Sequence, residues 1–399
     1  MNDDISDRSF AADIGQTGGS ARFPWAALVG VTATVSVFAI AQGLSYPLFT
    51  FLMQQQGMSP GMIGLSAAMT PLGIIASAPL IPAVTRRVGA ARLAILCALA
   101  AAILLASIGF LQNKFAWFAL RFLVGVAIDP LYVLSEVWMI SLAPPGKRGR
   151  VMGFYTAIVG AGFAAGPLSL LLVGTQGWPP FLLGIAAFLA CALCLVVVRK
   201  KLPGMEGDGS HVPMTSFLRL APALLLAVAV TAGYEQAMLA LFPVYGAGYG
   251  IGERTMSSLL ALMIAGNVVM QVPLGLLAER VSPRLLMVLC AAITAAGTAL
   301  LPLFVGGAGI WMLVFVVGGF SYSIYSMALI ELGNRFSGQA LVAGNAAFAV
   351  MWGVGGIGGP PGAGFAMQWQ GVEALPFVLA GACAVLVLFA LYRERRRGA

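Results

Sequence analysis

The sequence predicts an all-α integral membrane protein with twelve transmembrane helices, arranged as two parallel six-helix repeats with both termini in the cytoplasm. Three observations predict this fold. Of the 399 residues, 60% are hydrophobic and only 9% are charged, whereas a typical soluble domain has about 45–50% apolar and about 25% charged residues. Twelve apolar runs are long enough to span a bilayer, and landmarks of the first half recur in the second.

The predicted spans are the apolar runs between polar residues, glycines and prolines. A spanning helix needs about 20 mostly apolar residues. The twelve runs are 24–53, 60–85, 90–111, 115–142, 149–174, 178–199, 216–247, 254–281, 284–304, 308–334, 338–369 and 373–393. The first, seventh and eleventh exceed the thickness of a bilayer, so they must tilt, kink or protrude.

The distribution of basic residues predicts the orientation. If both termini are cytoplasmic, 19 of the 22 Lys and Arg residues lie in cytoplasmic segments. Only Lys114 and Arg254 lie on the opposite side, and Arg121 falls inside a span. Cytoplasmic segments of membrane proteins carry this excess of positive charge. We therefore expect a multi-pass protein of a bacterial inner membrane, whose net charge of +8 implies no nucleic-acid partner.

An internal repeat defines the predicted domains. The landmarks that recur 193 residues apart are Gly57 and Gly250, Tyr132 and Tyr325, and Gly166-Pro167 and Gly359-Pro360, while Trp117 and Trp311 are 194 apart. Parallel six-helix repeats of this kind build one large class of transporters. We expect halves at 23–199 and 216–393, a cytoplasmic linker at 200–215, a polar tail at 1–22 and a basic tail at 394–399.

One loop motif carries a resemblance to a known family. The stretch from Gly275 to Arg284, with Glu279 and Arg280, resembles the loop signature of the major facilitator superfamily, although Ser282 replaces its second glycine. The resemblance implies that the acid and arginines latch helix ends together on the cytoplasmic side. The first-half copy at 82–89 lacks its acid, so a symmetrical latch is not expected.

Two further motifs extend the resemblance over about residues 23–393. The run from Arg121 to Gly125 is similar to the family's R-x-x-x-G signature. Gly162, Gly166 and Pro167 resemble the antiporter signature G-x-x-x-G-P without its trailing glycines, and small residues on one face permit close helix packing. The resemblance implies a twelve-span secondary transporter, near bacterial members known only as uncharacterised transporters. We expect a monomer without cofactor.

Two acids in the fourth predicted span form a stripe. Asp129 and Glu136 are seven residues apart, which places them within about 20° of each other and roughly 10 Å apart along a helix. Tyr132 lies between them on nearly the same face. Such a stripe should face a cavity, because facing lipid is costly. An ion pair between Asp129 and Arg121 is the alternative interpretation.

Glu235 lies near the middle of the seventh span, between Tyr234 and Gln236. Three consecutive polar residues cannot face one way, so one should meet the cavity and another a neighbouring helix. Glu331 precedes Arg335 by four residues, which predicts a helix pair. Further candidates for lining the cavity and binding substrate are Gln42, Tyr46, Asn267, Gln271, Tyr322, Tyr325, Asn345 and Trp352.

The sequence offers no catalytic constellation. The single histidine, His211, excludes histidine triads and poly-histidine metal sites. Gly353, Gly355 and Gly358 have the spacing of a dinucleotide-binding motif. No strand precedes them and they lie inside the eleventh predicted span, so we reject this interpretation. No phosphate-binding loop for ATP hydrolysis occurs. We therefore expect no enzymatic activity, and transport must draw on gradients.

The sequence thus favours proton-coupled efflux of an amphipathic solute by antiport, with Asp129, Glu136, Glu235 and Arg121 as coupling residues. Asp129 is the first candidate for the coupling proton and Glu235 its nearest rival. Three alternatives stay open. The protein would import a small polar solute by proton symport, move a lipid-like molecule, or act as a receptor or structural subunit that has lost transport.

Overall fold

The structure is a computed structural model that describes residues 25–111, 113–142, 148–203, 220–336 and 338–398. The polar tail, most of the linker and His211 lie outside these residues. The first half contains α2 (Trp25–Gln55), α3 (Pro60–Ser77), η1 (Ala78–Leu80), α4 (Ile81–Val88), α5 (Ala90–Phe110), α6 (Lys114–Leu142), α7 (Arg148–Val173), α8 (Pro179–Val198) and η2 (Arg199–Lys201). The second contains α10 (Pro222–Gly248), α11 (Glu253–Ala278), α12 (Pro283–Ala299), α13 (Leu301–Phe304), α14 (Gly309–Arg335), α15 (Gly338–Gln370) and α16 (Ala374–Gly398).

Most of the described residues are helical, and none of them forms a strand. Nine helical stretches in this part of the chain are long and apolar enough to cross a membrane. The helices α7, α12 and α15 occupy the fifth, ninth and eleventh predicted segments. The chain is therefore a multi-pass helical membrane protein.

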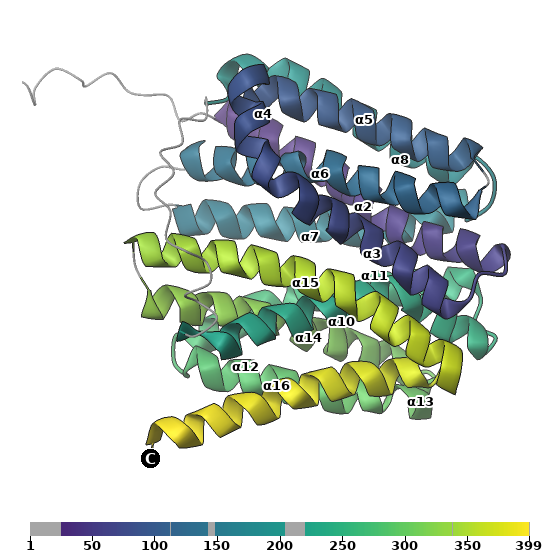
Figure 1. The fold of residues 1–399 in the computed structure, drawn as a ribbon, viewed down its shortest axis with the longest axis vertical. Helices are drawn as coiled ribbons and strands as arrows, with labels where there is room; N and C mark the ends of the chain where they lie inside the picture. Colours follow the sequence, from purple (N-terminus) through teal and green to yellow (C-terminus); the bar gives the residue numbers. More distant parts are fainter. Residues whose placement is uncertain (1–24, 112, 143–147, 204–219, 337, 399) are drawn as a thin grey trace, which may run out of the picture.

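The helix pairings of the first half recur in the second (Figure 1). In the first half α2 packs on α7 and α8, α3 on α6, and α5 on α6 and α8. In the second half α10 packs on α15 and α16, α11 on α14, and α12 on α14 and α16. The halves meet mainly where α3 contacts α15 and where α7 contacts α11. These cross-contacts leave the space between the halves to be lined by α2, α6, α10 and α14.

Paired glycines bring equivalent helices together. Gly73 on α3 and Gly125 on α6 face each other, and so do Gly266 on α11 and Gly318 on α14. A Cβ atom added at any of the four would lie 2.1 Å from a backbone carbonyl oxygen of the facing helix. Each glycine of the first pair is 193 residues from its counterpart, so the repeat extends to the packing of the backbones.

The turns that open the second helix of each half are also alike. Gly57 and Gly250 have φ angles of 68° and 71°, a left-handed conformation that glycine adopts without steric cost.

The departure at Ser282 from the loop signature has a local cause. Its hydroxyl accepts a hydrogen bond of 3.1 Å from the backbone N–H of Leu285 and so caps α12.

Candidate functional site

Glu235 lies on α10, where the two halves face each other. Its Oε2 atom is buried and has no hydrogen-bond partner among the described residues, and the same holds for Oε1 of Gln236. Tyr46 of α2, in the other half, interacts with the side chain of Gln236 and lies within electrostatic range of Arg121 and Glu235. A buried carboxylate without a partner is costly when ionised. A proton on Glu235 or a cation beside it would remove this cost.

Aromatic rings from α14 and α15 form one wall beside this acid. The ring centroids of Tyr325 and Trp352 are 5.2 Å apart, those of Tyr322 and Trp352 are 6.0 Å apart, and both pairs are edge-on. Tyr322 also contacts Tyr325 at 5.8 Å. Tyr322 lies within electrostatic range of Glu235 and of Glu136 on α6. Such rings offer negative faces to a cation and flat surfaces to an apolar group.

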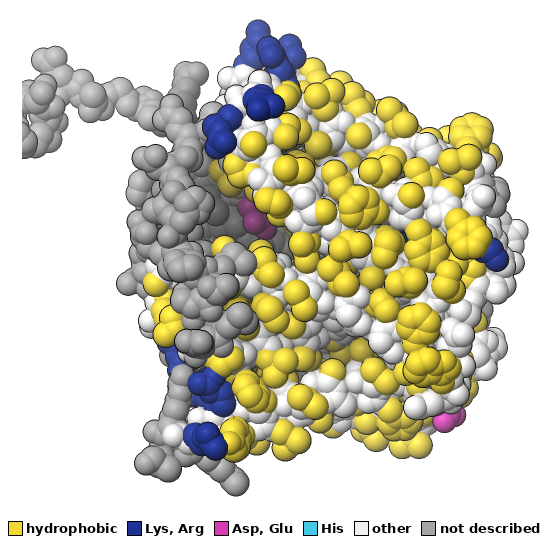
Figure 2. Space-filling view, viewed as in Figure 1, with side chains coloured by type: hydrophobic (Ala, Val, Ile, Leu, Met, Phe, Trp, Pro, Cys, Tyr) yellow, Lys and Arg dark blue, Asp and Glu magenta, His cyan; other side chains and the backbone are white. Residues whose placement is uncertain are grey.

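The opposite wall comes from α6. The ring of Tyr132 packs edge-on against Phe38, with centroids 4.5 Å apart, and its hydroxyl lies within electrostatic range of Glu136 and Glu235. Glu136 itself is exposed. Figure 2 shows the surface hollowed between the halves, at the end where Lys and Arg gather, with an acidic side chain inside the hollow. Glu136 and Glu235, on facing halves, thus lie near the same aromatic residue, Tyr322.

Arg121 and Asp129 do not pair with each other. The buried Arg121 guanidinium donates to Ser66 Oγ on α3 at 3.3 Å and lies 5.1 Å from the centroid of the Phe49 ring. Asp129, also buried, accepts a hydrogen bond of 2.8 Å from Ser77 Oγ at the end of α3. Eight residues separate the two along α6, about 12 Å along its axis. Asp129 therefore forms its hydrogen bond within the first half.

Several of the predicted lining residues make contacts of their own within the protein. The Tyr234 hydroxyl bonds to Thr298 Oγ1 on α12 at 2.7 Å, so Tyr234 meets a neighbouring helix. Gln271 donates to Asn267 Oδ1 at 3.0 Å along α11. Asn345 is exposed about two turns into α15, while Gln42 is buried on α2. The predicted helix pair forms, with Arg335 Nε 2.9 Å from Glu331 Oε1.

The end opposite the hollow is closed by contacts between the halves. Thr50 Oγ1 on α2 donates to the carbonyl oxygen of Ala240 on α10 at 2.8 Å. Glu253, the first residue of α11, accepts from Gln55 Nε2 at 3.1 Å and from the Thr175 hydroxyl, so it bonds to two elements of the first half. Sequence reasoning missed Glu253, because an acid in a first helical turn is already explained by the helix dipole.

The loop motif lies at the open end. Glu279 and Arg280 follow α11 and are exposed, and neither forms an ion pair with another described residue. The predicted latch between helix ends is therefore not engaged by these residues in this conformation. Gly275 has no atom within 4 Å of where a Cβ would lie, so its position does not depend on close packing.

The glycine and proline motifs lie at helix crossings. A Cβ on Gly162 would lie 2.8 Å from the Ser36 carbonyl oxygen of α2, and one on Gly166 would lie 2.2 Å from the Leu44 nitrogen. A Cβ on Gly359 of α15 would lie 2.4 Å from Cα of Gly233 on α10. The glycines of the two motifs thus lie at equivalent helix crossings, α7 with α2 in the first half and α15 with α10 in the second. Pro167 and Pro360 lie inside α7 and α15, where proline removes a backbone hydrogen bond.

The carbonyl oxygen of Pro360 faces Gly64 of α3, so the second of these crossings adjoins the other half.

Membrane-crossing helices in two similar halves, closed at one end and hollowed at the other around a polar site, define a membrane transport protein. The family model described as the Major Facilitator Superfamily matches residues 31–330 and 224–399. The chain belongs to this superfamily, and it is a secondary transporter rather than an enzyme.

Relatives and solved structures agree with this assignment. The chain is 27% identical over 351 residues to the uncharacterised MFS-type transporter YfkF of Bacillus subtilis, covering 84% of this chain and 87% of the relative. It is 24% identical over 346 residues to YcaD of Escherichia coli, covering 86% and 89%. Its fold is similar to the nucleoside transporter NupG, with a TM-score of 0.76 at 12% identity, covering 92% of this chain and 98% of that chain. It is also similar to a bacterial homologue of the human lysosomal transporter Spinster in an inward-facing and occupied conformation, with a TM-score of 0.71 at 14% identity, covering 94% and 96%.

Proposed function

We propose that the protein works by alternating access in a bacterial inner membrane, with twelve spans and both termini in the cytoplasm. The basic side chains gather at the hollowed end, and such residues favour the cytoplasmic side (Figure 2). The hollow is then open to the cytoplasm, and the contacts of Glu253 close the periplasmic end. Rocking of one half against the other would break these contacts and engage the helix ends near Glu279.

Proton coupling is proposed for the acids of the central site, and one observation carries it. Glu235 Oε2 is buried between the halves without a partner among the described residues. An ionised carboxylate there is costly, so the group exchanges a proton or a cation with the site as the halves move. In this proposal Glu136 exchanges protons with the open hollow. Arg121 supplies a positive charge near Tyr46. Asp129, which bonds to Ser77 within the first half, is not assigned a role in coupling.

The proposed substrate is an amphipathic solute that carries a positive charge, exported in exchange for protons. Tyr322, Tyr325 and Trp352 provide apolar faces and cation–π contacts. Glu235 and Glu136 both lie within electrostatic range of Tyr322. The second candidate is uptake of a small polar solute by proton symport. The likeness to a nucleoside transporter favours it, since aromatic faces also suit a planar base.

The proposal is tested by proton release from the purified protein in weakly buffered detergent. We expect amphipathic cations to release protons on binding, while neutral analogues of the same shape do not. Proton uptake on binding of nucleosides or other polar solutes would favour symport. No proton exchange and no counterflow of any of these solutes in liposomes would assign the protein to the receptor or structural class and overturn the transport proposal.

A further inference from the structure

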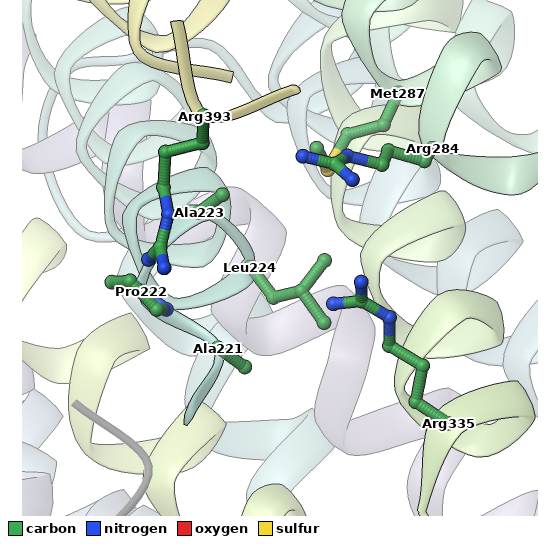
Figure 3. Close-up of a pocket in the computed structure, with 8 residues that line it drawn as sticks. All are labelled: Ala221, Pro222, Ala223, Leu224, Arg284, Met287, Arg335 and Arg393. Carbon is green, nitrogen blue, oxygen red and sulfur yellow. The ribbon is translucent and has the colours of Figure 1, made fainter. Parts of the chain in front are cut away.

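A pocket lies at the end of the second half where α10 begins, and arginines from three helices line it (Figure 3). Arg284 lies in the first turn of α12, Arg335 ends α14, and Arg393 lies on α16. Figure 3 shows Arg284 and Arg335 directed toward the space beside Leu224 from one side, and Arg393 lying along the other wall. The three side chains belong to separate helices, so the fold rather than the local sequence brings them together.

Among the described residues, one acid forms an ion pair with the arginines of this pocket. Glu331 pairs with Arg335 at 2.9 Å. Among the described residues, no carboxylate lies within 4 Å of the guanidinium of Arg284 or Arg393. Arg284 and Arg393 thus have no carboxylate partner among the described residues, while Arg335 pairs with Glu331. An anion bound between guanidinium groups reduces their mutual repulsion and accepts charge-assisted hydrogen bonds from them.

The start of α10 adds to the preference for an anion. This 27-residue helix has no side-chain cap at Ala221 and no acid in its first turn. Its N-terminus therefore presents an uncompensated positive dipole end to the pocket. Arginine is the side chain best suited to phosphate, because its planar fork donates two parallel hydrogen bonds.

The rest of the lining is apolar and consists of Ala221, Pro222, Ala223, Leu224 and Met287. Basic pockets between helix ends, with apolar surface beneath, suit the headgroup and glycerol region of a phospholipid. We propose that this pocket binds the phosphate of an anionic phospholipid, in the cytoplasmic leaflet under the orientation proposed above. Arg284 and Arg393 are the principal phosphate ligands, and Arg335 shares its charge between the phosphate and Glu331.

The test is native mass spectrometry of the purified full-length protein titrated with phosphatidylglycerol or phosphatidylcholine. The double variant Arg284→Gln with Arg393→Gln should weaken phosphatidylglycerol binding by about tenfold or more. Phosphatidylcholine binding should stay weak in every protein. The matched control is Arg86→Gln with Arg87→Gln, which removes the same charge from exposed positions on α4 and should change binding by less than about twofold.

Three results would overturn the proposal: equal binding of the two lipids, equal loss in the pocket and control variants, or displacement of the lipid by millimolar inorganic phosphate. The last would identify a free phosphate as the ligand. If the double variant does not fold, Arg284→Gln alone should weaken phosphatidylglycerol binding by about threefold or more, and unchanged binding contradicts the assignment. The measurement needs no transported solute, so its outcome is independent of the proposed transport reaction.

Discussion

The hydroxyl of Ser77 has one proton and two acceptors within reach. These are Asp129 Oδ2 at 2.8 Å and the carbonyl oxygen of Ile74 at 3.0 Å. An ionised Asp129 accepts a hydrogen bond from the Ser77 hydroxyl. A neutral Asp129 donates to Ser77 and frees that hydroxyl for Ile74. The protonation state of Asp129 thus selects the hydrogen bond made where α3 gives way to η1, within the first half.

We therefore predict that Ser77→Ala destabilises the protein by about 1–3 kcal/mol, because it leaves a buried carboxyl without its donor. The effect should shrink in an Asp129→Asn background, as measured by unfolding of the purified protein in detergent. Ser323→Ala is the matched control, since Ser323 is buried but bonds only to its own helix. Strictly additive effects of Ser77→Ala and Asp129→Asn would show that the two side chains are not coupled.

At the scale of the element, two neighbouring glycines on α15 differ in how closely they pack against another helix. Gly359 packs against Gly233 of α10, whereas a Cβ on Gly358 would meet no atom within 4 Å. Gly359→Ala should force α15 from α10, with a cost of about 1–3 kcal/mol and a loss of transport. Gly358→Ala should be neutral or stabilise the helix by up to about 1 kcal/mol. The measurement is thermal unfolding together with solute flux in liposomes, and equal effects of the two changes contradict the close crossing.

The helices could be predicted from the sequence because long apolar runs leave few alternatives in a membrane. The predicted segment 90–111 became a helix at 90–110, and 115–142 became 114–142. The second segment is interrupted at η1, where Pro79 and Pro82 lie close together. The glycine pairs were missed although they share the 193-residue offset, since coincidences are frequent among 50 glycines.

The neighbours of each polar face could not be predicted. Spacing placed Asp129 and Glu136 on one stripe of a helix, but Asp129 bonds to α3 while Glu136 is exposed. A helical wheel gives the residues that share a face, and tertiary packing decides what each part of that face meets. For the same reason, the sequence did not predict the hydrogen bonds between Tyr234 and Thr298 and between Gln271 and Asn267.

At the scale of the whole molecule, the orientation is open to a direct test. In a background that lacks the five native cysteines, Asp208→Cys and Gly398→Cys should resist impermeant thiol reagents in intact cells. Lys114→Cys, an exposed position on the opposite side, should react and serves as the matched control. Reaction at 208 or 398 from outside, or protection at 114, would reverse the proposed topology.

Glu235 is the centre of the proposed mechanism, and Asp129 is its natural comparison because both are acids inside helices. The most direct test is proton movement driven by a solute gradient in liposomes, with a solute that releases protons from the purified protein. We predict that Glu235→Gln reduces proton movement by at least about tenfold while solute-for-solute exchange continues, and that Asp129→Asn keeps proton movement. Undiminished proton movement in Glu235→Gln, with loss in Asp129→Asn, would place coupling in the first half and contradict the account.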